Sequence, residues 1–239
     1  MATRNLLYAH EIQINDHISV SIPTVGEVLD HEDDYYGMVY SITSTPCDMM
    51  VQLDDMGIDF TKIDDFDLFL LVFQMLRGQD TSLIFGGLDL SHFALDVSKE
   101  NGMVVLKDAK KGIVIDGLIH EQICWALRKM HGLKRNNKKP ANGAAKEYML
   151  ERARKKLRRR QNRIEDSQLE GLIVALVNTE QFSYTFETVR DMTIYQFNES
   201  LRQIIQKIDF DNKMRGIYAG TISAKDLRQD ELNWLAHKS

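Results

Sequence analysis

The sequence has few cysteines, and the two that it has are isolated. Cys47 and Cys124 lie far apart in the 239 residues, and neither belongs to a CxxC pair. This predicts two free thiols in a reducing compartment rather than a disulfide framework. The first ten residues contain no basic segment followed by a long apolar run, so they do not resemble a secretory signal. We therefore expect a cytoplasmic protein.

Long apolar runs are also missing. The most apolar stretch, Phe66 to Leu76, is interrupted by Asp67 and Gln74 and is too short to cross a bilayer. We therefore expect no contact with a membrane. Hydrophobic residues make up 44% of the chain and charged residues 27%, a composition that excludes a wholly disordered protein.

The chain lacks the short motifs of nucleotide-binding and hydrolytic enzymes. Neither GxxxxGK[ST] nor GxGxxG occurs, and HExxH and GxSxG are absent as well. The seven histidines are scattered along the chain, so a histidine metal site would have to be assembled from distant residues. We therefore expect no catalytic residue, no cofactor and no metal, and hence no enzymatic activity.

Six aspartates crowd within fourteen positions and are a candidate cation site. They are Asp54, Asp55, Asp59, Asp64, Asp65 and Asp67. Gly57 is present, but the alternating ligand spacing and the terminal glutamate of a calcium loop are missing. Acidic residues also favour the first turn of a helix, where they offset its macrodipole. We interpret Asp64 and Asp65 as the start of a helix; a metal site or a catalytic carboxylate pair is the alternative.

Charge is distributed unevenly, although the net charge is only −5. Residues 1–116 carry 20 acidic and 7 basic side chains, whereas residues 128–163 carry 15 basic and 2 acidic ones. Residues 164–239 are acidic again, with 12 acidic and 8 basic side chains. Different parts of the chain therefore have different electrostatic partners.

Hydrophobic periodicity predicts an α+β protein that is mostly helical. Apolar residues alternate on both sides of Asn15-Asp16, which predicts an N-terminal β-hairpin. Thr24 and Glu27 have the spacing of a capping box. Helices are predicted for residues 24–29, 30–44, 46–57, 66–76, 116–130, 144–163, 169–177, 185–192 and 193–208. Residues 66–76 are apolar nearly all round, so we expect them to form a buried central helix.

The apolar period changes to two in the middle of the chain, which predicts a small antiparallel sheet around residues 80–116. The predicted strands are Ser82–Phe85, Phe93–Val97, Met103–Leu106 and Gly112–Asp116. Asn101-Gly102 is a strong hairpin signal. Leu133–Gly143 is polar and basic and predicts a linker. We divide the chain into an acidic α+β domain (1–132), a basic linker and helix (133–163) and a helical C-terminal domain (164–239) whose tail docks on the core.

The basic helix is the candidate partner-binding site. It has almost no apolar stripe. The residues expected to bind a partner are Arg152, Lys155, Lys156, Arg158, Arg159, Arg160 and Arg163. Three interpretations remain open: a solvated helix, contact with an acidic protein surface of this or another chain, and salt-dependent binding of nucleic acid. Tyr148 is the only aromatic residue nearby, which argues against base stacking.

Several segments resemble an uncharacterised tail-module protein of bacteriophages that infect Gram-positive bacteria. They are INDHISVSIPTVGEVLDHEDDYYGMVYSITSTPCDM, DDFDLFLLVFQML followed by LIFGGLDLSHF, and WALRKMHGLKRNN. This resemblance covers most of residues 10–235 and supplies no catalytic residues. The segment TFETVRDMTIYQFNESL, from Thr185 to Leu201, is similar to a short pattern of phage tail assembly chaperones, in which an aromatic-Glu-x-Val-x-x-Met turn precedes an amphipathic helix.

The resemblance implies a non-enzymatic protein that binds the tape-measure protein or tube subunits during tail assembly, in the cytoplasm of the infected host. Helix-in-groove contacts suit such long helical partners. One alternative is a structural subunit of the virion, such as a baseplate or connector protein. The other is a nucleic-acid-binding protein that uses residues 134–163.

Overall fold

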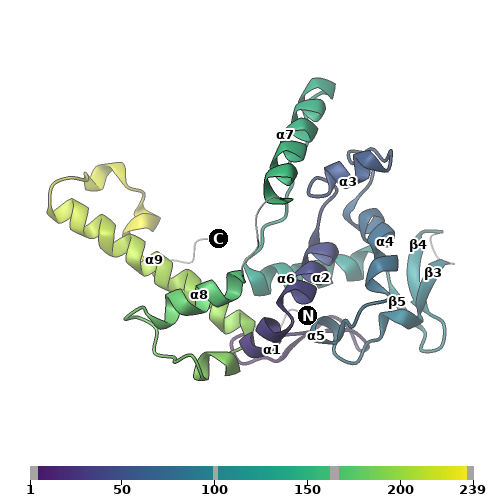
Figure 1. Ribbon diagram of the computed structural model, residues 1–239, viewed down its shortest axis with the longest axis horizontal. Helices are drawn as coiled ribbons and strands as arrows, with labels where there is room; N and C mark the ends of the chain where they lie inside the picture. The colour runs from purple at the N-terminus through teal and green to yellow at the C-terminus, as the bar shows by residue number, and fades with distance from the viewer. Residues whose placement is uncertain (1–4, 99–101, 162–166, 236–239) are drawn as a thin grey trace.

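The computed structural model describes residues 5–98, 102–161 and 167–235. It confirms the predicted fold class, with mostly helices, an N-terminal two-stranded hairpin and a three-stranded antiparallel sheet in mid-chain (Figure 1). The α-helices are α1 (Val25–Asp30), α2 (Glu32–Thr43), α3 (Met50–Asp55), α4 (Asp65–Leu76), α5 (Ser82–Phe85), α6 (Gly117–His131), α7 (Gly143–Gln161), α8 (Gln168–Val177) and α9 (Ile194–Tyr218). The strands are β1 (Glu11–Gln13), β2 (Ser19–Ser21), β3 (Phe93–Val97), β4 (Val104–Asp108) and β5 (Ile113–Ile115). Single turns of 3-10 helix are η1 (Leu90–His92), η2 (Thr188–Asp191), η3 (Ala224–Asp226) and η4 (Gln229–Leu232).

The N-terminal hairpin and the helix after it form as predicted. β1 pairs with β2 so that Ile12 lies opposite Val20, and both side chains are buried. The Asn15 side chain closes the turn by accepting the backbone N–H groups of His17 and Ile18. The capping box of Thr24 and Glu27 is present at the start of α1. These features depend on residues close in sequence, which is why local spacing predicted them.

α6 lies at the centre of the fold, where it contacts α2, α4, α9, β2 and β5. The Asp116 carboxylate caps its first turn by accepting the N–H of Ile119 at 2.9 Å. Gly132 ends the helix with a φ of +62°, a left-handed conformation that favours glycine. The packing of α6 therefore joins the N-terminal hairpin, the mid-chain sheet and α9.

One cluster of buried apolar side chains extends across the boundaries drawn from the sequence. It includes Ile12 and Phe69 from the acidic part and Phe197 from the C-terminal part. The two parts also share backbone hydrogen bonds: Val25 N–H donates to Met192 and Ile194 N–H donates to Pro23, both at 2.8 Å. The three-part division of the chain stays a prediction, but its first and third parts contribute to the same core.

Two expectations about individual elements are wrong. Ser82–Phe85 is a helical turn, α5, rather than a strand, because Thr81 accepts from the backbone of Ile84 and Phe85, and Gly86 ends the turn with a φ of +57°. α4 is not buried all round, since Leu71 and Met75 on its outer side are 46% and 72% exposed. The sheet therefore contains only β3, β4 and β5 among the described residues, in that order.

The last helix is longer than predicted and supports the tail. α9 runs to Tyr218, and the tail folds back onto it rather than onto the main core (Figure 1). Gln203 donates to the carbonyl of Trp234 at 3.1 Å, and Lys207 Nζ lies 5.6 Å from the centroid of the Trp234 ring system.

No helix within the described residues combines the length and the apolar character needed to cross a bilayer.

Phe197 provides a test of the shared core. Its side chain is fully buried, so Phe197→Ala should lower the free energy of unfolding by about 3–5 kcal/mol in urea denaturation. Ile205 lies on the same helix but is 58% exposed, so the control Ile205→Ala should cost less than about 1 kcal/mol. Equal losses for the two variants would contradict the packing described here.

Candidate binding site on the basic arm

We call residues 133–161 the basic arm; it consists of the predicted linker and α7. The linker has no regular structure over residues 133–142, as predicted, and the Asn142 side chain caps α7 by accepting the N–H of Ala145 at 2.8 Å. α7 rises from the body of the molecule beside α3, and the two helices are in contact (Figure 1). Met149, Leu150 and Ala153 pack against the core, so α7 has an inner and an outer face.

The cations on the inner face of α7 are paired with aspartates of the acidic half. Arg154 Nη2 lies 2.7 Å from Asp54 Oδ2 and 2.6 Å from Asp55 Oδ1. Lys146 Nζ lies 2.7 Å from Asp59 Oδ1. Together with hydrogen bonds from Thr61, Lys146 holds the pKa of the Asp59 carboxyl well below its usual range. The acidic and basic parts of the sequence thus meet within one chain.

The linker is anchored to the acidic half as well. Arg135 Nε donates to Asp65 Oδ2 at 2.8 Å, and Arg128 Nη2 lies 3.8 Å from the same oxygen. Asn136 donates to the Asp48 side chain at 2.8 Å. These contacts fix the path of the linker toward α7.

The six clustered aspartates have separate structural roles. Asp64 and Asp67 form a capping box at the start of α4, which confirms the predicted helix start. Asp54, Asp55, Asp59 and Asp65 pair with the arm. Across the described residues, no three His, Cys, Asp or Glu side chains are grouped so that they would hold a metal ion.

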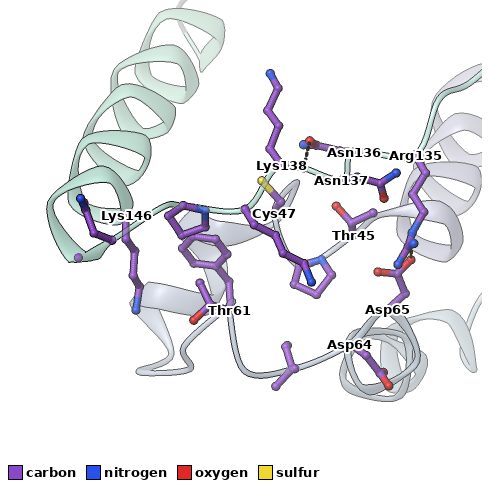
Figure 2. A pocket seen from close by; sticks show the side chains of 17 residues that line it. Thr45, Cys47, Thr61, Asp64, Asp65, Arg135, Asn136, Asn137, Lys138 and Lys146 are labelled. Carbon is purple, nitrogen blue, oxygen red and sulfur yellow. Dashed lines mark hydrogen bonds and ion pairs between the residues drawn. The ribbon is translucent and has the colours of Figure 1, made fainter.

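A cavity of about 700 Å³ lies between the linker and the acidic half. Figure 2 shows Asn136 and Lys138 on one side of it and Asp64 and Thr61 on the other, with Arg135 directed at Asp65. Cys47 also lines the cavity, and burial raises the pKa of its thiol. Among the cations in the lining, Arg135 and Lys146 are already balanced by Asp65 and Asp59.

The outer face of α7 carries most of the residues predicted to bind a partner. Arg152, Lys155, Lys156, Arg158 and Arg159 are all exposed. Lys155 pairs with Glu151 at 2.6 Å, whereas the other four make no ion pair with any described residue. Arg163 and the side chain of Arg160 lie outside the part of the chain that the structure describes.

A second, apolar surface lies on α8. Leu172 and Val174 are 38% and 47% exposed, and Gly171 and Ala175 are exposed between them. We call these four residues the outer face of α8. It contains no charged side chain, while Leu169, Ile173 and Leu176 on the opposite side are buried in the core. The periodicity of α8 indicated its buried side but gave no reason to expect an exposed apolar one.

A buried histidine and cysteine on α6 escaped the sequence analysis. His120 Nε2 lies 3.2 Å from Cys124 Sγ, and both side chains donate to the carbonyl of Ile42, at 3.1 and 3.2 Å. Burial lowers the pKa of His120 to about 4 and raises the pKa of Cys124 to about 12. Both groups are therefore neutral near pH 7, and the pair lacks the thiolate that nucleophilic attack requires. The i, i+4 spacing of His120 and Cys124 was the only sequence signal for this contact.

The buried His120 predicts a pH dependence of stability. Its folded-state pKa of about 4 lies below the ordinary value of 6.5, so the unfolded chain takes up a proton first as the pH falls. The free energy of unfolding should decrease between pH 6.5 and 4, with up to about 3 kcal/mol from this residue. Burial also lowers the pKa of His131 to about 4, so His131 adds to the same decrease in the free energy of unfolding.

Urea denaturation across this pH range measures the effect. His120→Gln removes one titrating group and should flatten the pH dependence, whereas His17→Gln, at an exposed position, should leave it as in the wild type. An unchanged pH dependence in His120→Gln would show that His120 is not held neutral.

Comparison with known families finds a match for part of the chain. Residues 159–238 match the family model of the YomV second domain, a range that includes α8, α9 and the folded-back tail. Neither the curated proteins nor the solved structures give a match. Over residues 159–238, about a third of the chain, the protein is therefore similar to the YomV second domain, a domain from a Bacillus prophage protein.

Proposed function

We propose that this protein is a non-enzymatic binding factor of phage tail assembly, acting as a tail assembly chaperone or tail-associated factor. The observation that carries the proposal is the exposed, uncharged outer face of α8 within the phage-related domain. The resemblance of Thr185–Leu201 to tail assembly chaperones supports the same class of function. This segment forms η2 and the start of α9.

The outer face of α8 has the properties of a helix-binding surface. Exposed groups of apolar side chains often mark sites of protein interaction, because burying them on binding is favourable. Gly171 and Ala175 lie one turn apart, and a Cβ atom at position 171 would meet nothing within 4 Å. A partner helix therefore has room to approach α8 closely, with Leu172 and Val174 on either side of the contact.

The proposed partners are the tape-measure protein and the tail-tube subunits of the same phage. A long helical protein such as a tape measure exposes apolar helix faces before assembly, and an apolar helix surface covers such faces. Polar residues flank the outer face of α8 at Gln168 and Glu170, which suits a contact with an apolar centre and a polar rim.

Substitutions on α8 test this surface directly. The double variant Leu172→Asp, Val174→Asp should weaken binding to the tape-measure protein or tube subunits at least tenfold in biolayer interferometry, because binding would desolvate both new charges. A matched control is Leu95→Asp, Val97→Asp, which changes two residues on β3 that are 53% and 57% exposed. The control should bind as the wild type does. Wild-type affinity in the α8 variant would rule out this surface as the binding site.

Deletion of the gene and analysis of purified particles test the role in assembly. Loss of tails after deletion is expected, and normal tails would contradict the proposal. Mass spectrometry of particles distinguishes an assembly chaperone from a structural subunit of the virion, since a chaperone should be absent from the virion. A baseplate or connector subunit would instead be present in a fixed ratio to the tube protein.

A further inference from the structure

We propose that the outer face of α7 binds the phosphate backbone of duplex DNA. This inference is independent of the function proposed for α8, because it rests on a different helix and on charge rather than on apolar surface. Its basis is the unequal pairing of the two faces of α7. The inner cations Arg154 and Lys146 are paired with aspartates, whereas Arg152, Lys156, Arg158 and Arg159 on the outer face and its flanks have no acidic partner among the described residues.

The charge density of this face matches that of a nucleic-acid duplex. Apart from the inner Arg154, five cations lie from Arg152 to Arg159, a rise of about 10 Å along the helix axis, and one of them, Lys155, is paired with Glu151. Duplex DNA presents one negative charge per ~1.7 Å, or about six over the same length. Lys134, Lys138 and Lys139 in the linker are exposed as well.

The composition of the face favours a polyanion over an acidic protein. At the centre of protein interfaces, apolar and aromatic side chains and arginine supply most of the binding energy, whereas lysine and acidic residues are depleted there. From Glu151 to Arg159, α7 carries two apolar side chains, Ala153, which packs on the core, and Leu157, which is 36% exposed. They are four residues apart and therefore share one side of the helix, away from Arg152, Lys155 and Arg159. The acidic protein surface predicted as one partner of this helix is already present within the chain, on α3 and the loop after it.

The same composition favours a duplex over a single strand. Proteins that bind single strands without sequence preference combine cations with aromatic side chains on which bases stack. Tyr148 is the only aromatic residue of α7, and it is exposed one turn before the cation cluster. Contacts limited to phosphates predict binding that is independent of base sequence and depends strongly on salt.

Fluorescence anisotropy with a labelled 24-base-pair duplex tests the inference on the full-length protein. Wild-type affinity should fall on the order of 100-fold between 50 and 200 mM salt if about four phosphates are contacted. The variant Arg152→Gln, Lys156→Gln, Arg158→Gln, Arg159→Gln should bind at least tenfold more weakly at 50 mM salt. These side chains are exposed, so the circular dichroism spectrum and the melting temperature should be unchanged.

A control with the same change in net charge shows whether the position of the removed cations, and not the net charge alone, determines the affinity for the duplex. Lys62→Gln, Lys110→Gln, Lys111→Gln, Lys225→Gln removes four exposed positive charges outside the arm and should weaken binding less than threefold. Equal losses in the two variants, or no wild-type binding at 50 mM salt, would overturn the inference. Polyglutamate that competes with the duplex at equal charge concentration would also overturn it, because the face would then recognise acidic polypeptides.

Discussion

The carbonyl groups at the C-terminal end of α2 are satisfied by three side chains of α6, and the rest of the fold depends on this contact. His120 and Cys124 donate to the carbonyl of Ile42, and Arg128 donates to that of Thr43 at 2.5 Å. These residues are four apart, so they lie in a row on one side of α6. The last carbonyls of a helix have no partner within it, and leaving them buried without one would be costly. Arg128 also places a positive charge at the negative end of the α2 dipole.

The opposite end of α2 connects the acidic part to the segment that matches the YomV second domain model. The Glu32 carboxylate, in the first turn of α2, accepts the N–H of Leu169 at 3.0 Å and the hydroxyl of Ser167. It thus sits at the positive N-terminal end of α8, where a negative charge is stabilising. α6 holds one end of α2 and α8 holds the other. The two hydrogen bonds attach the start of α8 to α2, and the burial of Leu169, Ile173 and Leu176 leaves the outer face of α8 directed away from the core.

Features that depend on neighbouring residues could be predicted from the sequence. Features that depend on contacts between distant elements could not. The capping box of Thr24 and Glu27, the linker and the bounds of α6 follow from local spacing. Ser82–Phe85 was misassigned because four residues are too few to separate a helical turn from a strand by periodicity. The contact of His120 and Cys124 with α2 joins residues about 80 positions apart, and no local pattern predicts such a distance in sequence. The difference between the two faces of α7 likewise depends on where α3 lies.

The uneven distribution of charge along the sequence therefore has two consequences, and they can be distinguished only in the folded structure. Part of the basic arm neutralises the acidic half, since Arg135, Lys146 and Arg154 each have an aspartate partner. Each such pair is exposed enough that it adds little stability alone, but together they define the position of α7. Once α7 is held by its inner face, the cations on its outer face are directed away from the acidic half. The outer side of α7 thereby carries most of the cations that have no acidic partner among the described residues, and Glu151 beside them is paired with Lys155. The density of these outer cations is the feature on which the proposed binding of duplex DNA rests.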